Sequence, residues 1–340
     1  MSTLTLGRTG LTITKDAFGA LPLQRASKAD AGRILGKALD AGINFIDTAR
    51  AYTDSEEKIA AALAHRRSEF FIATKTMAKE PSAFWKDLDT SLRTLKTDCI
   101  DVYQMHNASV IPRPEDGSGL YEALQMAQHQ GKIRFMGVTC HRLGPAREAA
   151  ESGLYDTLQF PFSYLSGEKD LELVDCCAKH NVGFIAMKAL SGGLLTDIFT
   201  ARAFMEGFPN VAPIWGIQRA EEMDLLIEAM RRPAELSAAQ RARIEADRAA
   251  LSGDFCRGCG YCMPCPANIE IFTCARMSLM TGRMPLERVL SDEFRSKMEQ
   301  TRDCIDCGAC VTKCPYGLDP PELLRRNREA YQSFLSAHDT

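Results

Sequence analysis

The most constraining feature of the sequence is a repeated alternation of short apolar runs with segments of helical periodicity. Eight apolar runs rich in β-branched and aromatic residues lie at 16–21, 44–48, 70–74, 99–105, 133–138, 157–162, 182–187 and 212–217. The helical segments that follow them lie at about 28–41, 54–66, 81–96, 117–130, 143–152, 168–180, 197–206 and 219–231. Strands that alternate with helices pair in parallel, and eight such units predict an α/β fold, a closed (β/α)8 TIM barrel. Residues 4–18 alternate around an Arg-Thr-Gly turn, which predicts a hairpin before the barrel.

The alternation stops near residue 233. Residues 233–250 predict an Ala-, Arg- and Glu-rich helix with no strand before it, and a block of cysteines follows directly. The stretch between the two cysteine blocks and the tail from residue 320 are also helical in character. We therefore predict a barrel domain at 1–232 and a small C-terminal α-helical domain at 233–340.

Eight of the thirteen cysteines fall in two short runs, CRGCGYCMPCP at 256–266 and CIDCGACVTKCP at 304–315. In the second run two residues separate each of the first three cysteines, three precede the fourth, and proline follows. Bacterial ferredoxins hold 4Fe-4S clusters with this spacing. The first run has two residues rather than three before Cys265. Zinc is the alternative for Cys-x-x-Cys pairs, but one tetrahedral set of four ligands would not require two such runs, each followed by proline.

In two-cluster ferredoxins the fourth cysteine of each run binds the other cluster. This rule predicts two 4Fe-4S clusters, one held by Cys256, Cys259, Cys262 and Cys314, and the other by Cys304, Cys307, Cys310 and Cys265. We expect Cys99, Cys176, Cys177 and Cys274 to be buried packing residues.

Composition excludes several other classes of function. A formal charge of −3 leaves no basic footprint for nucleic acid, and no apolar run approaches the roughly 18 residues of a membrane span. The N-terminal stretch has no apolar signal region. We expect a cytoplasmic protein, in which clustered thiols serve as metal ligands more often than as disulfides.

Polar residues follow the second, third and fourth predicted strands, at the end where barrels of this type carry their active sites. Asp47 ends the second predicted strand and Tyr52 lies in the loop just after it, Lys75 ends the third strand and His106 ends the fourth. A phenol is a poor acid at neutral pH unless a nearby cation favours its phenolate, and Lys75 could be that cation, held by Asp47. His106 could hydrogen-bond a substrate oxygen or relay a proton. These residue types suit the interconversion of a carbonyl and an alcohol.

Four stretches carry a resemblance to a known family: FIDTARAYTDSE, FIATK, DVYQMH and LQFPFSYL. They resemble the motifs of the aldo-keto reductase family, and the likeness extends over residues 1 to about 230. It implies that Tyr52 is the proton donor, that Lys75 and Asp47 tune it, and that His106 orients the carbonyl. The helical two-cluster domain likewise resembles the ferredoxin-like domain fused to some members of the family.

The same resemblance implies NADP(H) bound without a Rossmann motif. Thr139 and Gln159 match the carboxamide-binding residues of the family, Cys140 stands where many members have Asn, and Phe162 matches the ring that stacks on nicotinamide. The phosphates are expected at the loops 189–195 and 216–222, with Arg219 on the 2′-phosphate; the loop residues concerned are Ser191, Gly193, Leu194, Gly216, Gln218, Arg219 and Glu222. Thr53 replaces the usual Gly after the tyrosine, and Leu225-Leu226 replace a Glu-Asn pair that usually contacts adenine.

The sequence leaves two roles open for the clusters. They could pass electrons between an external one-electron carrier, such as a ferredoxin or flavodoxin, and the barrel, or they could be structural. Nicotinamide moves two electrons as hydride, clusters move one each, and no flavin motif is recognisable. The main hypothesis is an oxidoreductase acting on a small-molecule carbonyl or alcohol. The alternative is an electron-transfer or redox-sensing iron–sulfur protein whose barrel is mainly a docking platform.

Overall fold

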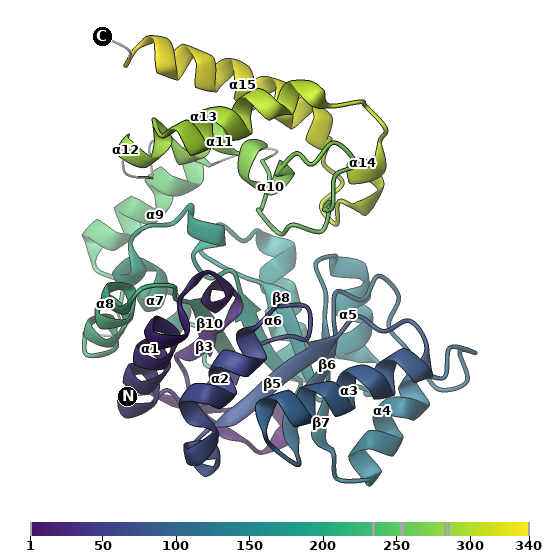
Figure 1. The fold of residues 1–340 in the computed structure, drawn as a ribbon. Helices are drawn as coiled ribbons and strands as arrows, with labels where there is room; N and C mark the ends of the chain where they lie inside the picture. Colours follow the sequence, from purple (N-terminus) through teal and green to yellow (C-terminus); the bar gives the residue numbers. More distant parts are fainter. Residues whose placement is uncertain (1, 233–234, 252–254, 282–283, 285, 339–340) are drawn as a thin grey trace. The chain divides into compact units, whose positions relative to one another are not determined.

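The computed structural model describes residues 2–232, 235–251, 255–281, 284 and 286–338 (Figure 1). The chain divides into two compact units, Met1–Ala189 with Asp197–Gln240, and Leu190–Thr196 with Arg241–Thr340. The boundary predicted between 232 and 233 adjoins residues 233–234, which lie outside the described residues, and it stays a prediction.

The first unit is a closed barrel of eight parallel strands in the order β10-β3-β4-β5-β6-β7-β8-β9 (Figure 1). This confirms the predicted fold. The strands are β3 (Ala17–Gly19), β4 (Phe45–Asp47), β5 (Phe71–Thr76), β6 (Ile100–Met105), β7 (Ile133–Thr139), β8 (Thr157–Pro161), β9 (Gly183–Met187) and β10 (Val211–Gly216). Each lies within or close to a predicted run. The first run is cut short because Leu21–Arg25, with Pro22 near its start, forms the 3-10 helix η2 instead.

A helix follows each strand, at bounds close to the prediction. They are α1 (Lys28–Asp40), α2 (Ser55–Leu63), α3 (Pro81–Leu95), α4 (Leu120–His129), α5 (Leu143–Glu151), α6 (Glu168–Lys179), α7 (Ile198–Glu206) and α8 (Ala220–Met230). Local chemistry sets the ends of these helices. Ser27 caps α1 by accepting the backbone N–H of Asp30, and Pro81 occupies the first position of α3.

A hairpin of β1 (Thr3–Thr5) and β2 (Thr12–Thr14) precedes the barrel, as predicted. Its leucines and Ile13 pack in one core cluster with side chains of the barrel strands. Gly7, which follows β1, has φ +53°, and a Cβ atom there would lie 2.1 Å from the backbone nitrogen of Gly183. Only glycine permits this close approach of the hairpin to β9.

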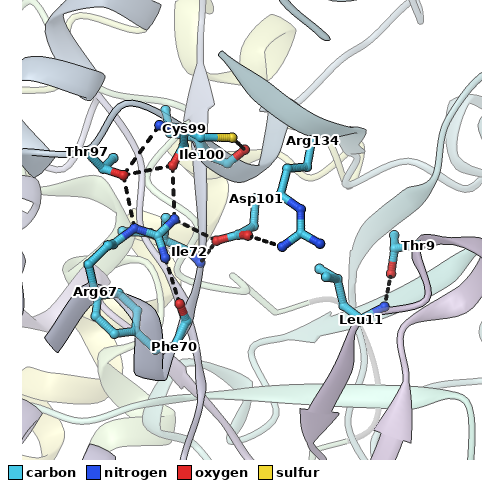
Figure 2. Close-up of polar contacts among 10 residues, drawn as sticks. All are labelled: Thr9, Leu11, Arg67, Phe70, Ile72, Thr97, Cys99, Ile100, Asp101 and Arg134. Atoms are coloured by element: carbon cyan, nitrogen blue, oxygen red, sulfur yellow. Dashed lines mark hydrogen bonds and ion pairs between the residues drawn. The ribbon is translucent and has the colours of Figure 1, made fainter. Parts of the chain in front are cut away.

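Buried ionic groups link the amino ends of the strands. Asp101, near the start of β6, accepts hydrogen bonds from Arg67 Nη2 at 2.8 Å, Ile72 N at 2.9 Å and Arg134 Nη1 at 2.7 Å (Figure 2). Because its carboxylate has two cations and a backbone donor, its burial is compensated. The group ties β5, β6 and β7 together at the end of the barrel opposite the expected active site.

A second group of this kind closes the barrel seam. Asp16, which precedes β3, accepts from Arg202 Nε at 2.9 Å and from Trp215 Nε1 at 2.9 Å. Arg202 lies on α7 and Trp215 on β10. The Asp16 carboxylate therefore joins the start of the first barrel strand to α7 and to the last strand. Burial raises the pKa of Asp16, and the Arg202 charge opposes that shift.

The second unit is helical in its described residues, as predicted. Its helices are α9 (Ala238–Ala250), which begins in the first unit, α10 (Ile271–Cys274), α11 (Met277–Met280), α12 (Leu286–Val289), α13 (Asp292–Glu299), α14 (Ala309–Lys313) and α15 (Pro320–Ser336), with the 3-10 helix η5 (Gln300–Asp303). The core forms around α15 and includes Met277, Phe294 and Tyr331. Along the described residues, no helix is both long and apolar enough to cross a membrane.

Candidate functional site

Asp47 and Lys75 form a buried ion pair at the carboxyl ends of β4 and β5. Lys75 Nζ donates to Asp47 Oδ1 at 2.6 Å and to the carbonyl oxygen of Thr48 at 2.5 Å. Only 1% of the lysine side chain and 2% of the aspartate side chain are exposed. Burial lowers the pKa of Lys75 and raises that of Asp47, while the charge of each residue opposes the shift of the other. Each residue therefore depends on the charge of the other to remain ionised in this buried position.

Two amide side chains complete the shell of the Asp47 carboxylate. Gln104 Nε2 donates to Asp47 Oδ2 at 3.1 Å, and Gln159 Nε2 donates to Asp47 Oδ1 at 3.3 Å. The sequence patterns assigned no role to Gln104. The residue type could have indicated a role for Gln104, because Gln104 is a polar residue inside a strand whose residues are all buried. These donors hold the carboxylate in place and thereby fix the position of Lys75.

Tyr52 lies in the loop after β4, and its ring meets both Lys75 and His106. Lys75 Nζ is 5.2 Å from the centroid of the tyrosine ring, and the His106 ring packs edge-on at 5.8 Å between centroids. Tyr52 is half-buried. The structure thus brings together all four residues predicted from the strand ends.

The loop after β4 that carries Tyr52 contains a residue, Thr53, with an uncommon backbone conformation. Tyr52 N donates to the carbonyl oxygen of Ala49 at 3.0 Å, and Ser55 N donates to that of Tyr52 at 2.8 Å. Between these turns Thr53 has φ +38°, a left-handed backbone angle that is costly for a β-branched residue. This is the position at which the sequence departs from the usual glycine.

His106 follows β6 directly, and its backbone N–H donates to the carbonyl oxygen of Thr76 at 2.8 Å. Burial, with a smaller contribution from the Lys75 charge, lowers the pKa of the imidazole to about 3. The ring is therefore neutral at physiological pH. A neutral imidazole can donate a hydrogen bond to a carbonyl oxygen, but it does not carry a proton ready for transfer.

A second buried carboxylate, Glu56 on α2, lies near this group. It accepts hydrogen bonds at 2.7 Å from Thr74 Oγ1 and from Ser91 Oγ, and it forms an ion pair with Arg50. Only 1% of its side chain is exposed. Its negative charge favours the charged form of Lys75, in the same direction as Asp47.

Thr139 ends β7, Gln159 lies in the middle of β8, and the two residues are paired across these strands. Gln159 Oε1 is buried and has no hydrogen-bond partner among the described residues. An unsatisfied buried acceptor of this kind fits the N–H group of a carboxamide. Thr139 Oγ1 accepts from Asn107 N at 2.6 Å, and the fully buried Cys140 has its pKa raised to about 12 by burial, so its thiol stays protonated.

Phe162 lies in an aromatic cluster. Its ring centroid is 5.8 Å from that of Phe184, 6.0 Å from that of Phe204 and 5.0 Å from that of Phe208, and 1% of the residue is exposed. These neighbours cover the ring that the resemblance assigns to stacking on nicotinamide. No local motif signals this packing, because Phe204 and Phe208 lie more than 40 residues further along the chain.

The expected phosphate loop after β10 carries its own carboxylate. Glu222 Oε2 accepts the backbone N–H of Gln218 at 2.8 Å and that of Arg219 at 3.1 Å, and Glu222 Oε1 accepts from Arg219 Nε at 2.9 Å. The N-terminus of α8 and the Arg219 guanidinium are thus both engaged by Glu222. Gly216 ends β10 immediately before this loop. The other expected phosphate residues, Ser191, Gly193 and Leu194, belong to the second unit.

Two cavities of the second unit are each surrounded by thiols from both cysteine runs. Cys256, Cys259, Cys262 and Cys314 line the first cysteine cavity, together with apolar side chains such as Leu318 and Leu323. Cys265, Cys304, Cys307 and Cys310 line the second cysteine cavity, where Cys262 also contributes. Among the described residues no group of His, Cys, Asp or Glu is arranged to hold a single metal ion. Each cavity has the donors and apolar surroundings that suit an iron–sulfur cluster.

The fold and the site together define a (β/α)8 barrel with a Tyr, Lys, Asp and His group at its strand ends, joined to a cysteine-rich helical domain. The chain belongs to the aldo/keto reductase family, whose family model matches residues 4–207. A model described as a 4Fe-4S dicluster domain matches residues 255–319. Both parts of the resemblance seen in the sequence are thereby confirmed.

Relatives of known name agree with this assignment. The chain is 29% identical over 206 residues to an uncharacterized oxidoreductase, YqkF, of Bacillus subtilis and 32% identical over 211 residues to L-galactose dehydrogenase of Arabidopsis thaliana, and each match covers 56% of this chain and 66% of the relative. The chain thus spans slightly less than two thirds of these relatives. A solved structure of the aldo-keto reductase AKR11C1 from Bacillus halodurans, 22% identical, superposes with a TM-score of 0.64 over 73% of this chain and 96% of that chain, which shows the shared fold.

Proposed function

We propose that this protein is an oxidoreductase that interconverts a small-molecule carbonyl compound and its alcohol with a nicotinamide dinucleotide, NADP(H) on the sequence prediction. One observation carries the proposal. The half-buried phenol of Tyr52 lies against a fully buried ammonium, Lys75, and against the imidazole of His106, which is neutral. This combination supplies an acid whose phenolate is stabilised and a hydrogen-bond donor for the same oxygen.

The roles of the side chains follow from their environments. In the direction of reduction Tyr52 gives its proton to the substrate oxygen, and the phenolate left behind is stabilised by Lys75. Asp47 and Glu56 keep Lys75 charged against the cost of its burial. His106 holds the substrate oxygen with a hydrogen bond and does not change its charge. A bound dinucleotide would supply the hydride for reduction and accept it in oxidation, and the unsatisfied oxygen of Gln159 suits its carboxamide.

The test compares Tyr52→Phe with the unchanged protein, both purified without oxygen and assayed with NADPH and NADH against a panel of aldehydes, ketones and alcohols. We expect Tyr52→Phe to lose turnover by at least about a hundredfold, the typical contribution of a positioned acid, while its iron and sulfide contents stay the same. Turnover retained by this variant would refute the mechanism. No turnover by the unchanged protein with either dinucleotide would refute the proposed activity.

The cysteine sets are part of the same proposal. We expect about eight irons per chain, in two 4Fe-4S clusters. Cys314→Ser should damage the cluster held by Cys256, Cys259 and Cys262 and leave about four irons. Cys274→Ser is the matched control, because Cys274 is fully buried in the same unit, donates to the carbonyl oxygen of Lys297 at 3.4 Å and lines neither cavity. Equal iron contents in the two variants would contradict the crossed ligand sets.

A second candidate function is electron transfer between the clusters and an external one-electron carrier such as a ferredoxin or flavodoxin. It is favoured by the exposure of Cys307 and of its apolar neighbour Ile305, which is 67% exposed beside the second cysteine cavity. Anaerobic titration followed by electron paramagnetic resonance tests it. Clusters that never change oxidation state with NADPH, substrate or reduced carrier would leave them a structural role.

A further inference from the structure

The second unit includes a segment, Leu190–Thr196, that the chain contributes between β9 and α7. It contains the 3-10 helix η4 (Ser191–Gly193), in which Ser191 and Gly192 have φ values of +48° and +67°. The carbonyl oxygen of Gly192 accepts a hydrogen bond from Arg276 Nη1 at 2.8 Å. Backbone N–H groups of Gly193 and Leu195 donate to the carbonyl oxygen of Leu190 at 2.9 and 3.2 Å. The side chain of Arg276, which is not part of this segment, thus holds the tightly turned backbone of Leu190–Thr196.

The same guanidinium lies against the first cysteine run. A Cβ atom at Gly258, between Cys256 and Cys259, would lie 2.6 Å from Arg276 Nη1 and 2.7 Å from its Cζ. A Cβ atom at Gly192 would lie 3.0 Å from Nη1 and 3.3 Å from the carbonyl oxygen of Arg257. The guanidinium is therefore packed closely against the backbone of both glycines, and a side chain at Gly258 would have to displace it.

The backbone of Arg276 is held independently of Gly192 and Gly258. Arg276 lies between α10 and α11, and its backbone carbonyl accepts a hydrogen bond from Leu279 N at 3.0 Å. The nearby Cys274 and Met277 are fully buried in the core of the unit. The cysteine run differs in this respect, because residues 256–266 form no helix or strand. Its order is expected to come from metal binding by its thiolates.

We infer that Arg276 is a positioning residue that couples the loop Leu190–Thr196 to the first cysteine run. When Cys256 and Cys259 bind their cluster, Gly258 is fixed, the guanidinium is confined, and the loop is held. When the cluster is absent, the run loosens and the loop loses its external support. The loop carries Ser191, Gly193 and Leu194, so on the proposed function this coupling makes dinucleotide affinity depend on the state of the first cluster.

Hydrogen exchange measured by mass spectrometry on the full chain tests the coupling. We expect exchange in the 190–196 peptide to be about tenfold faster after the clusters are removed by an iron chelator, and about tenfold faster in cluster-loaded Arg276→Ala, as for the loss of one charge-assisted hydrogen bond. Arg276→Lys should restore part of the protection. The control is Arg302→Ala, which removes an exposed arginine paired with Glu299 in the same unit.

Equal exchange of this peptide in the loaded and stripped unchanged protein would overturn the coupling, and this comparison stands even if Arg276→Ala loses iron. Dinucleotide affinity is measured separately, by the fluorescence of NADPH and NADH titrated with each protein. We expect the dissociation constant of Arg276→Lys to rise severalfold with little change in kcat. Faster exchange with unchanged affinity would remove the loop from the proposed dinucleotide site and leave the coupling intact.

Discussion

Replacing His106 with glutamine tests whether the imidazole in the barrel is neutral in the folded protein. Burial lowers the pKa of His106 to about 3 from an ordinary value of 6.5. Below the ordinary value the unfolded chain takes up a proton that the folded protein does not, so the free energy of unfolding falls as the pH falls. Glutamine can still hydrogen-bond but does not titrate, and it removes this proton difference.

The size of the effect follows from the two pKa values. Each pH unit between them changes the free energy of unfolding by about 1.4 kcal/mol. On going from about pH 7.5 to about pH 5, the unchanged protein should lose about 2 kcal/mol more than the His106→Gln variant. Burial also lowers the pKa of His141, which adds to the acid sensitivity of both proteins. The charge of His106 is itself a smaller cause of the His141 shift, after burial and Lys188, so the difference between the two proteins reports on His106 together with its effect on His141.

Urea unfolding followed by tryptophan fluorescence measures this difference. Both tryptophans of the chain, Trp85 and Trp215, lie in the first unit, so the signal reports on the barrel and not on the cysteine-rich unit. His129→Gln, at the exposed end of α4, shows whether the removal of any histidine has the same effect. Parallel pH dependences for the unchanged protein and His106→Gln would refute the neutral assignment, and with it the role of His106 as a hydrogen-bond donor of constant charge.

Three further substitutions test other parts of the site. Lys75→Met should lower the unfolding free energy of the barrel by about 3–5 kcal/mol in the same urea assay, because Asp47 would remain buried without its cation; a change below about 1 kcal/mol would contradict this. Thr53→Gly should raise that free energy by about 0.5–1 kcal/mol, because it relieves a β-branched residue at φ +38°, and an unchanged urea midpoint would show that no strain is stored there. Glu222→Gln should raise the affinity for NADPH relative to NADH by about three- to fivefold in fluorescence titrations, because it removes a carboxylate from Arg219; an unchanged ratio would place the 2′-phosphate elsewhere.

Periodicity predicted the barrel well because parallel strands in this fold follow the chain in order. β4, β5 and β6 are neighbours in the sequence and in the sheet, so residues at their carboxyl ends had to meet. This is why the sequence alone suffices to group Asp47, Lys75 and His106. The short tight turn after β4 then places Tyr52 beside them.

Contacts that depend on distant helices could not be predicted in this way. The cover of Phe162 comes from Phe204 on α7 and from Phe208 just beyond that helix, and no pattern near Phe162 indicates it. The hydrogen bond from Arg276 to Gly192 joins residues 84 positions apart. The engagement of Arg219 by Glu222 is different, because an Arg and a Glu three residues apart at a helix start are a local signal that was present in the sequence.

The cysteine cavities also set the order in which the protein can be completed during synthesis. A nascent chain that has reached residue 303 offers three of the four thiols proposed for the first cavity and only Cys265 of those proposed for the second. The second set is complete once Cys310 has been added, and the first once Cys314 has been added. Neither set is therefore complete before the second cysteine run has been made, by which point every residue of the barrel has already been synthesised.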